Sequence, residues 1–293
     1  DTLIRPTHER TAVLTLAYEE GTIRITGDVP TGLPGVERDP RSKTARAPGF
    51  RYRDVRDALD ERGVLYEDRV LDLPSLDLSS TYELRGYQQT ALSAWQDDER
   101  GVLELPTGSG KTVIGIKAIE TLGTPTLVVV PTIDLVAQWR SELEAEFGVP
   151  IGQFGGGEQR REAITVSTYD SAYLRADEIG DTFGFVLFDE VHHLGGEGYQ
   201  EIARLLAAPA RMGLTATFER PDGAHEAIAD LVGPLVHRVS VDELAGEHLA
   251  DYDIKRIEVS LTPEERAAYE RNQEVFTDYL AQSNIQLRSG SDY

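Results

Sequence analysis

The stretch LELPTGSGKT at 103–112 decides the fold of this chain, together with FDEVHH at 188–193. In the first stretch an apolar run enters a glycine-rich turn, and a helix-like segment follows. Such a turn presents backbone N–H groups to phosphates, and the partial positive charge of the helix N-terminus adds to the attraction. The common phosphate-loop pattern has a glycine five residues before Gly110, where this chain has Leu105. The remaining match still predicts a site for a nucleoside triphosphate.

Residue types in the two stretches fit the chemistry of phosphoryl transfer. Lys111 is placed to reach the outer phosphates, and the hydroxyl of Thr112 is placed to bind Mg²⁺. Asp189 ends the apolar run FGFVLF and supplies a second anchor for the metal, while Glu190 is placed to activate a water molecule. We therefore expect Lys111, Asp189 and Glu190 to be catalytic. The loop residues expected to bind the nucleotide are Thr107, Gly108, Ser109, Gly110, Lys111 and Thr112.

The second stretch taken alone also fits a solvated turn or a metal site. A zinc protease would carry two histidines four residues apart on a helix, around a glutamate. His192 and His193 are adjacent in this chain, which argues against zinc.

From about Tyr82 short apolar runs alternate with helix-like segments, a pattern typical of an α/β fold whose parallel sheet is covered on both faces. In such sheets ligands bind beyond the carboxyl ends of the strands. A polar turn follows each of five runs, and we predict that the five turns converge on one edge, although any single one is ordinary strand-end chemistry. The turns are Pro106–Thr112, Pro131–Thr132, Thr168–Tyr169, Asp189–Glu190 and Thr215–Thr217.

The residues before this sheet predict a small α+β domain. AVLTLAYEEGTIRITG at 12–27 alternates as a β-hairpin does, 30–49 has the composition of a loop, and an amphipathic helix begins at Phe50 and ends at Gly63. DLPSLDLSST at 72–81 has the composition of a linker. The domains are thus expected at 1–76, with a linker at 77–81, a sheet domain at 82–241 and a final segment at 242–293. In that segment Thr262, Pro263 and Glu265 predict a helix start, and Tyr269, Phe276, Tyr279 and Leu280 an apolar stripe.

The chain is strongly acidic, with 51 Asp and Glu against 29 Lys and Arg among 293 residues. A uniformly negative surface repels DNA. The acids are scattered along the chain, however, so we interpret them as an adaptation to a salt-loving host, where a Debye length of roughly 3 Å in molar salt screens the repulsion.

Cysteine is absent, which excludes disulfides and cysteine-bound metals. No apolar run approaches the ~20 residues that cross a membrane, and no signal-peptide core is present, so a cytoplasmic protein without membrane partners is expected.

The motifs together resemble, in order and spacing, the first half of a superfamily 2 helicase, and specifically an archaeal XPB-type helicase. The resemblance covers nearly the whole chain, and in that family a phosphate loop without the first glycine is normal. It implies a RecA-like sheet domain with ATP and Mg²⁺ as cofactors. The matching stretches are RGYQQTAL at 85–92, LPTGSGKT, VVPTIDLVAQW at 129–139, TVSTYDSAY at 165–173, FDEVHH and GLTATFERPDG at 213–223.

The resemblance also implies roles for residues outside the phosphate loop. Gln88 would contact adenine, with Arg85 in the same nucleotide-binding segment. The turns at Pro131–Thr132 and Thr168–Tyr169 would bind the phosphates of one DNA strand, and Gly155–Gly157 is either a further close approach or a flexible surface loop. The residues that would couple the nucleotide to DNA are His192, Thr215 and Thr217. The family's Arg-Glu-Asp element for opening duplex corresponds to Arg220, Pro221 and Asp222, so we expect its role to be altered by the proline.

The family hydrolyses ATP between two RecA-like domains, and this sequence carries no second one. Its final helix resembles the start of a thumb-like insertion, and its first domain resembles a module for damaged DNA. The expected function is an ATP-dependent 3′–5′ DNA helicase or translocase of nucleotide excision repair, acting on single-stranded, forked or distorted DNA, with a nuclease partner implied by the resemblance. We expect little ATP turnover by this chain alone. The alternatives are a non-enzymatic, nucleotide-gated DNA clamp, which Glu190 argues against, and a restriction or remodelling translocase.

Overall fold

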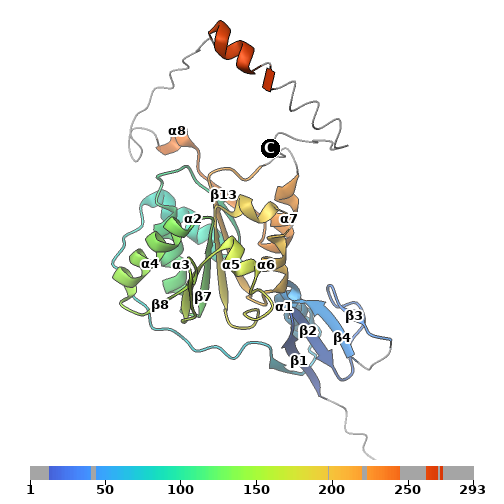
Figure 1. Ribbon diagram of the computed structural model, residues 1–293. Coiled ribbons are helices and arrows are strands. Elements are labelled where there is room, and N and C mark those ends of the chain that lie inside the picture. Colours follow the sequence, from blue (N-terminus) through green and yellow to red (C-terminus); the bar gives the residue numbers. More distant parts are fainter. Residues whose placement is uncertain are drawn as a thin grey trace, which may run out of the picture. The chain divides into compact units, whose positions relative to one another are not determined.

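The computed structural model describes residues 13–40, 44–196, 198–219, 223–244, 262–269 and 271–272 (Figure 1). The chain forms two compact units, Asp1–Ala250 and Asp251–Tyr293. Two sheets lie in the first unit. Arg220, Pro221 and Asp222 fall outside the described residues, as do Phe276, Tyr279 and Leu280. Among the described residues, no helix has the length and apolar character that spanning a bilayer would require.

The first sheet has the strand order β3-β4-β2-β1-β5 and is covered by one helix. β1 (Leu14–Glu19) and β2 (Thr22–Thr26) form the predicted hairpin, and α1 (Tyr52–Glu61) is the predicted helix. Leu16, Ile23, Ile25, Val55 and Leu59 are completely buried between the sheet and α1. Alternating apolar residues on both elements therefore build this core, as the pattern indicates.

The loop predicted at 30–49 is wrong in its second half. β3 (Glu37–Arg38) and β4 (Thr44–Pro48) extend the sheet beyond β2, and β5 (Tyr66–Arg69) pairs in parallel with β1. β4 buries only Ala45 and Ala47, and small side chains give a weak apolar alternation. Pairing with β2 therefore stabilises β4 although its own apolar pattern is weak, because strand formation depends on neighbouring strands more than on intrinsic propensity.

The second sheet has eight strands in the order β13-β6-β12-β11-β7-β10-β8-β9. The five predicted strands are confirmed and run parallel to one another: β6 (Arg100–Glu104), β7 (Thr126–Val130), β10 (Ile164–Thr168), β11 (Phe185–Asp189) and β12 (Ala210–Thr215). Three more strands lie outside the five. They are β8 (Ile151–Gly155), β9 (Glu158–Arg160) and β13 (Leu235–Arg238).

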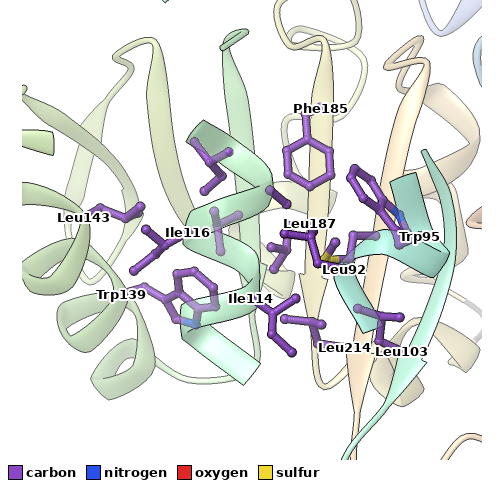
Figure 2. Packing of buried hydrophobic residues seen from close by; sticks show 14 of the residues in the cluster. Leu92, Trp95, Leu103, Ile114, Ile116, Trp139, Leu143, Phe185, Leu187 and Leu214 are labelled. Carbon is purple, nitrogen blue, oxygen red and sulfur yellow. The ribbon is translucent and has the colours of Figure 1, made fainter. Parts of the chain in front are cut away.

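Helices cover both faces of this sheet, as predicted. One core lies between the sheet and α2 (Gly86–Gln96), α3 (Lys111–Leu122) and α4 (Ile133–Phe147), and Figure 2 shows Trp95, Ile114 and Trp139 within it. The opposite core contains residues of α5 (Tyr169–Tyr173), α6 (Gln200–Leu205) and α7 (Ala224–Leu231). Every residue of β7 and β11 is buried, because successive side chains point into opposite cores.

The first sheet and the second are packed closely within the first unit. A Cβ at Gly21 or Gly49 would clash with Leu205 at the end of α6, so only glycine permits this approach. The Arg100 guanidinium donates to the Phe50 carbonyl at 3.1 Å and to Asp54 Oδ1 at 3.2 Å. The two cores also share residues, since Phe50 belongs to a core of the second sheet and Ala207 to the core of the first.

Arginines of the first domain therefore have partners within the protein. Arg51 donates to Asp230 Oδ1 at 2.7 Å and Arg53 to Asp98 Oδ1 at 2.9 Å. These ion pairs give both side chains a structural role at the contact between the two sheets.

The segment predicted as a linker contains no helix or strand. It is nevertheless held along the second sheet's helices. The Leu76 N–H donates to the Gly123 carbonyl at 2.7 Å, and the Ser80 hydroxyl donates to Glu146 Oε2 at 2.7 Å. Leu76 and Leu78 pack against the core beside α3 and α4.

The second unit begins a helix where the sequence predicts it. Thr262 Oγ1 accepts from the Glu265 N–H at 3.3 Å, and Glu265 Oε2 accepts from the Thr262 N–H at 2.8 Å. This reciprocal pair is the predicted capping box. Tyr269 is exposed within this unit.

Candidate nucleotide and DNA site

The five predicted turns meet at one edge of the second sheet. Because β6, β12, β11, β7 and β10 are parallel neighbours, their carboxyl ends lie side by side. Glu104 pairs with Thr215, and Thr168 pairs with Val130, so the registers place the strand ends at the same level. The convergence predicted from the sequence is thus confirmed.

The phosphate loop turns at two glycines and then starts α3. Gly108 and Gly110 have φ values of 80° and 76°, in the left-handed region that favours glycine. Thr107 and Gly108 are exposed, whereas Ser109 is buried and its hydroxyl has no hydrogen-bond partner among the described residues. Exposed backbone N–H groups at the start of a helix can donate hydrogen bonds to the phosphates of a nucleotide, and so can the Ser109 hydroxyl.

Lys111 joins the phosphate loop to the acidic strand end. Its Nζ donates to the Leu105 carbonyl at 3.3 Å and lies 3.8 Å from Glu190 Oε1. The Lys111 side chain is 11% exposed, so this cation lies in a largely desolvated position between the two stretches. The residues predicted to be catalytic are therefore neighbours in space, and Thr112 follows Lys111 in the first turn of α3.

Asp189 is a buried carboxylate with two fixed donors. The Trp139 indole N–H donates to Oδ2 at 2.9 Å, and the Glu190 N–H donates to Oδ1 at 3.0 Å. Burial raises the pKa of Asp189, and the neighbouring Glu190 carboxylate raises it further, whereas the Trp139 bond and Lys111 lower it. A hard divalent cation would offset the cost of this desolvated charge, so the oxygen set of Asp189 and Thr112 fits Mg²⁺.

Glu190 sits at a strained turn and begins a chain of polar contacts. Its φ of 49° is unusual for a residue other than glycine. Glu190 Oε2 lies 3.4 Å from His192 Nδ1, which in turn lies 3.2 Å from Thr215 Oγ1. The Thr215 hydroxyl donates to the Thr217 carbonyl at 2.9 Å. The three residues predicted to couple nucleotide and DNA thus form one connected path from Glu190.

Gln88 lies beneath the phosphate loop. Its Nε2 donates to the Ser109 carbonyl at 2.9 Å, and its Oε1 accepts from the Arg85 N–H at 2.9 Å. The Tyr87 hydroxyl donates to the same Ser109 carbonyl at 2.7 Å. This segment therefore fixes the loop from below, while the adenine contact of Gln88 stays a prediction.

Two turns predicted to bind DNA start helices. Thr132 Oγ1 accepts from the Leu135 N–H at 3.3 Å and caps α4. Thr168 Oγ1 accepts from the Ser171 N–H at 3.2 Å and caps α5. Both helix starts face the open strand edge, where hydroxyl and N–H groups suit phosphates without reading sequence.

The glycine turn at 155–157 lies against both helix starts. A Cβ at Gly156 would approach Ile133 Cδ1 to 2.7 Å, and a Cβ at Gly155 would approach Thr168 Oγ1 to 3.2 Å. All three glycines have positive φ. The turn and the two helix starts therefore form one continuous surface.

Tyr169 does not share the exposure of its neighbour Thr168. Its side chain is buried, and its hydroxyl donates to the Asp189 carbonyl at 3.1 Å. A DNA contact at position 169 is thus left to the backbone.

Sequence reasoning missed three side chains that shape this site, Tyr87, Trp139 and the buried ring of Tyr169. The sequence offered one indication of them, because a buried indole N–H or phenol hydroxyl needs a hydrogen-bond acceptor. Which acceptor each would find depends on contacts between distant segments.

Two family models match this chain. Residues 81–220 match the model described as "Type III restriction enzyme, res subunit", and residues 16–70 match "Xeroderma pigmentosum group B helicase damage recognition domain". The second match covers α1 and nearly all of the first sheet, and the first match begins at the end of the linker and covers most of the second sheet.

Curated relatives carry the XPB name or a related one. "DNA 3'-5' translocase XPB2" of Sulfurisphaera tokodaii is 45% identical over 261 residues, which are 89% of this chain and 60% of that protein. "Putative DNA 3'-5' helicase Rad25" of Halobacterium salinarum is 38% identical over 66% of this chain and 31% of its own length. "DNA 3'-5' helicase XPB" of Mycobacterium tuberculosis is 31% identical over 64% of this chain and 36% of its own length.

This chain thus spans less than two thirds of each of these three relatives, from 31% to 60% of their length. Within that span the similarity includes a module named for XPB and a sheet domain whose strand ends carry the predicted helicase motifs. The chain is therefore a homologue of the XPB-type DNA 3′–5′ helicases over most of its length.

Proposed function

We propose that this chain carries the first nucleotide-binding half of an ATP-dependent 3′–5′ DNA translocase or helicase that acts in DNA repair. The observation that supports it best is the meeting of Lys111 with Glu190, 3.8 Å apart, beside the buried Asp189. A phosphate-binding loop, a cation and two carboxylates are the parts that phosphoryl transfer requires. The relatives named as a DNA 3'-5' translocase and a DNA 3'-5' helicase support DNA as the substrate and 3′–5′ as the direction of movement.

Each residue has a defined task in this proposal. The N–H groups from Thr107 to Gly110 and the Lys111 ammonium hold the phosphates. Thr112 and Asp189 hold Mg²⁺, which neutralises phosphate charge when it is bound. Glu190 orients and deprotonates the attacking water, and its contact with His192 leads to Thr215 and Thr217.

The base of the nucleotide has a place beside α2. A cavity of about 430 Å³ is lined by Gly86, Tyr87 and Thr90 of that helix together with Arg238 and Leu244. It lies next to the segment that holds Gln88 and Arg85, so this proposal places adenine there.

The DNA strand lies along the surface formed by Thr132, Thr168 and the glycine turn at 155–157. Single-stranded, forked or distorted duplex DNA is the proposed partner, and a nuclease partner is proposed on the resemblance alone. The acidic surface suits work in a salt-rich cytoplasm, and Halobacterium and Haloarcula proteins are among the relatives.

The test compares nucleotide binding by the parent chain, Lys111→Ala and Lys117→Ala in molar KCl. Both lysines lie on α3, but Lys117 pairs with Glu120 on its own helix, so it is the matched control. We expect Lys111→Ala to weaken MgADP binding by about tenfold or more, and Lys117→Ala by less than twofold, because a charged hydrogen bond contributes about 1.5–3 kcal/mol. Equal affinities in all three proteins would contradict the proposal.

Hydrolysis is measured on the same proteins with and without forked DNA. Arginines from a second RecA-like domain stabilise the transferring phosphoryl group in this superfamily, and arginine fingers contribute ~10³–10⁵ in rate. We therefore expect weak turnover by this chain and strong, Lys111-dependent turnover by a form that includes such a domain. Nucleotide-responsive DNA binding without turnover in either form would favour the clamp.

A further inference from the structure

Tyr169 connects two parts of the site that have separate tasks in the proposed function. It is the first residue of α5, directly after Thr168, whose hydroxyl caps that helix. Its side chain is 2% exposed and runs beneath the strand edge. The hydroxyl donates to the carbonyl of Asp189, the last residue of β11.

The Asp189 carbonyl, which accepts this hydrogen bond, lies where the chain leaves β11 and makes a strained turn. Glu190 follows with φ 49° and ψ 54°, after which the 3₁₀ helix η2 (Val191–Gly195) begins. The direction of the Asp189 carbonyl fixes the peptide plane between Asp189 and Glu190. A group that holds this carbonyl therefore also fixes how the two carboxylates project.

Aromatic contacts keep the Tyr169 ring from moving independently. Its centroid lies 6.3 Å from Phe188, 5.8 Å from His193 and 5.4 Å from Tyr199. The Tyr199 hydroxyl donates to Asp170 Oδ1 at 2.5 Å, at an exposed position. Burial and the two nearby carboxylates raise the pKa of Tyr169 well above its usual range, so the hydroxyl keeps its proton and remains a donor.

We propose that Tyr169 is a positioning residue that links the Thr168 turn to the Asp189 and Glu190 carboxylates, so that DNA binding and nucleotide binding change each other's affinity. The inference rests on the proposed function, because it takes the Thr168 turn as a DNA contact. A strand that shifts the start of α5 moves Tyr169, and the hydroxyl transmits that shift to the Asp189 carbonyl. Thermodynamic linkage requires the reverse effect to be equally large.

The test measures coupling instead of activity. The affinity of a single-stranded oligothymidylate is measured with and without MgADP for the parent, Tyr169→Phe and Tyr199→Phe. Tyr199→Phe is the matched control because it removes a hydroxyl from the same aromatic cluster that does not bond to Asp189. Thermal unfolding of each variant shows that it is folded.

We expect MgADP to change the strand affinity of the parent and of Tyr199→Phe by about fivefold or more, the lower range of allosteric coupling. In Tyr169→Phe the change should fall below twofold, with MgADP present at a concentration that saturates each protein. Coupling that survives unchanged in Tyr169→Phe overturns the inference. A parent that binds both ligands without coupling also overturns it and leaves the ATP site standing, whereas a parent that binds no nucleotide overturns the proposed function as well.

Amide hydrogen exchange of the parent gives a second test that needs no variant. Oligothymidylate alone should slow exchange in residues 190–195, and MgADP alone should slow exchange in residues 169–174. A strand that protects 169–174 without any change at 190–195 would show that the two segments respond separately, and the inference would be wrong.

Discussion

Single buried side chains hold the catalytic strand end in place, and Trp139 is the clearest case. Trp139 lies on α4 and its ring packs in the core between the sheet and the helices (Figure 2). Its indole N–H donates to Asp189 Oδ2 at 2.9 Å. This bond favours the charged carboxylate, whereas burial opposes it. Trp139 thus contributes both to the packing of the core and to the charge state of Asp189. Replacing it by phenylalanine keeps an aromatic ring in the core and removes the hydrogen bond.

Trp139→Phe should weaken binding of MgADP by about tenfold, because the bond to a charged acceptor contributes about 1.5–3 kcal/mol. Trp95→Phe is the matched control. Trp95 lies in the same core and donates its indole N–H to the Arg211 carbonyl at 2.9 Å. Titration calorimetry on both variants checks this, and equal losses of affinity would point to core repacking as the common cause.

The same substitution should shift the pH dependence. The Trp139 bond lowers the pKa of Asp189, so its removal raises a pKa that burial has already raised. A proton then competes with Mg²⁺ at higher pH. MgADP binding by Trp139→Phe should therefore begin to fail at a higher pH than in the parent as pH is lowered, and identical profiles would argue against this role of the bond.

At the scale of elements, α6 connects the nucleotide site to the first domain. Gln200 at its start donates to the Gly195 carbonyl at 3.4 Å, two residues after His193. Leu205 at its end fits against Gly21 and Gly49. Arg211, completely buried, donates to the Ala203 carbonyl at 2.8 Å and to the Leu231 carbonyl at 2.7 Å, and so joins the ends of α6 and α7.

Arg211→Met should lower the free energy of unfolding by about 3 kcal/mol or more, because each buried carbonyl left unsatisfied costs about 1–3 kcal/mol. Arg204→Met is the control, since Arg204 lies on α6 but is half exposed and pairs with Glu201. Its loss should cost less than about 1 kcal/mol, as for other surface ion pairs. Urea unfolding measures both, and a small effect at Arg211 would mean that water satisfies those carbonyls.

The elements also show how far sequence reasoning reaches. Continuous apolar runs predicted β6, β7, β10, β11 and β12, because strands buried on both faces carry that pattern. The pattern is weaker in β4, which buries two alanines, and in β13, none of whose residues is fully buried. The phosphate loop and the acidic strand end were likewise readable, since their chemistry is local. Trp139 and Tyr169 both bond to Asp189, on another element, and Arg211 bonds to carbonyls at the ends of two helices, so no local pattern reveals these contacts.

For the whole molecule, the shared cores predict one unfolding transition for the two sheets. Gly49→Ala would place a Cβ against the Leu205 carbonyl, and overpacking of this kind costs about 1–3 kcal/mol. We expect the variant to unfold in two steps in calorimetry, with the first domain melting earlier. Gly86→Ala is the control, because a Cβ there meets nothing within 4 Å. A single transition in both variants would show that the contact adds little to cooperativity.

Net charge acts on the whole molecule as well. The chain carries a formal charge of −22, so self-repulsion opposes the compact state at low salt. Raising KCl from about 0.1 M to about 2 M should raise the unfolding midpoint, because the Debye length falls from roughly 10 Å to a few ångströms. NaCl at the same ionic strength should have a similar effect, and a midpoint that falls with salt would refute the screening argument.

The exchange of core residues between the two sheets has a consequence for how this chain can be recombined with its relatives. A crossover in the irregular segment 72–81 would transfer Gly21, Gly49 and Phe50 without Leu205 and Ala207, which complete the same contact from the far side of the junction. In a chimaera of distant parents, the two sides of this contact would come from different proteins and would not be matched in shape. Exchanging 200–211 together with the first domain would keep both sides of the contact from one parent. The segments that must be exchanged together are thus discontinuous in sequence.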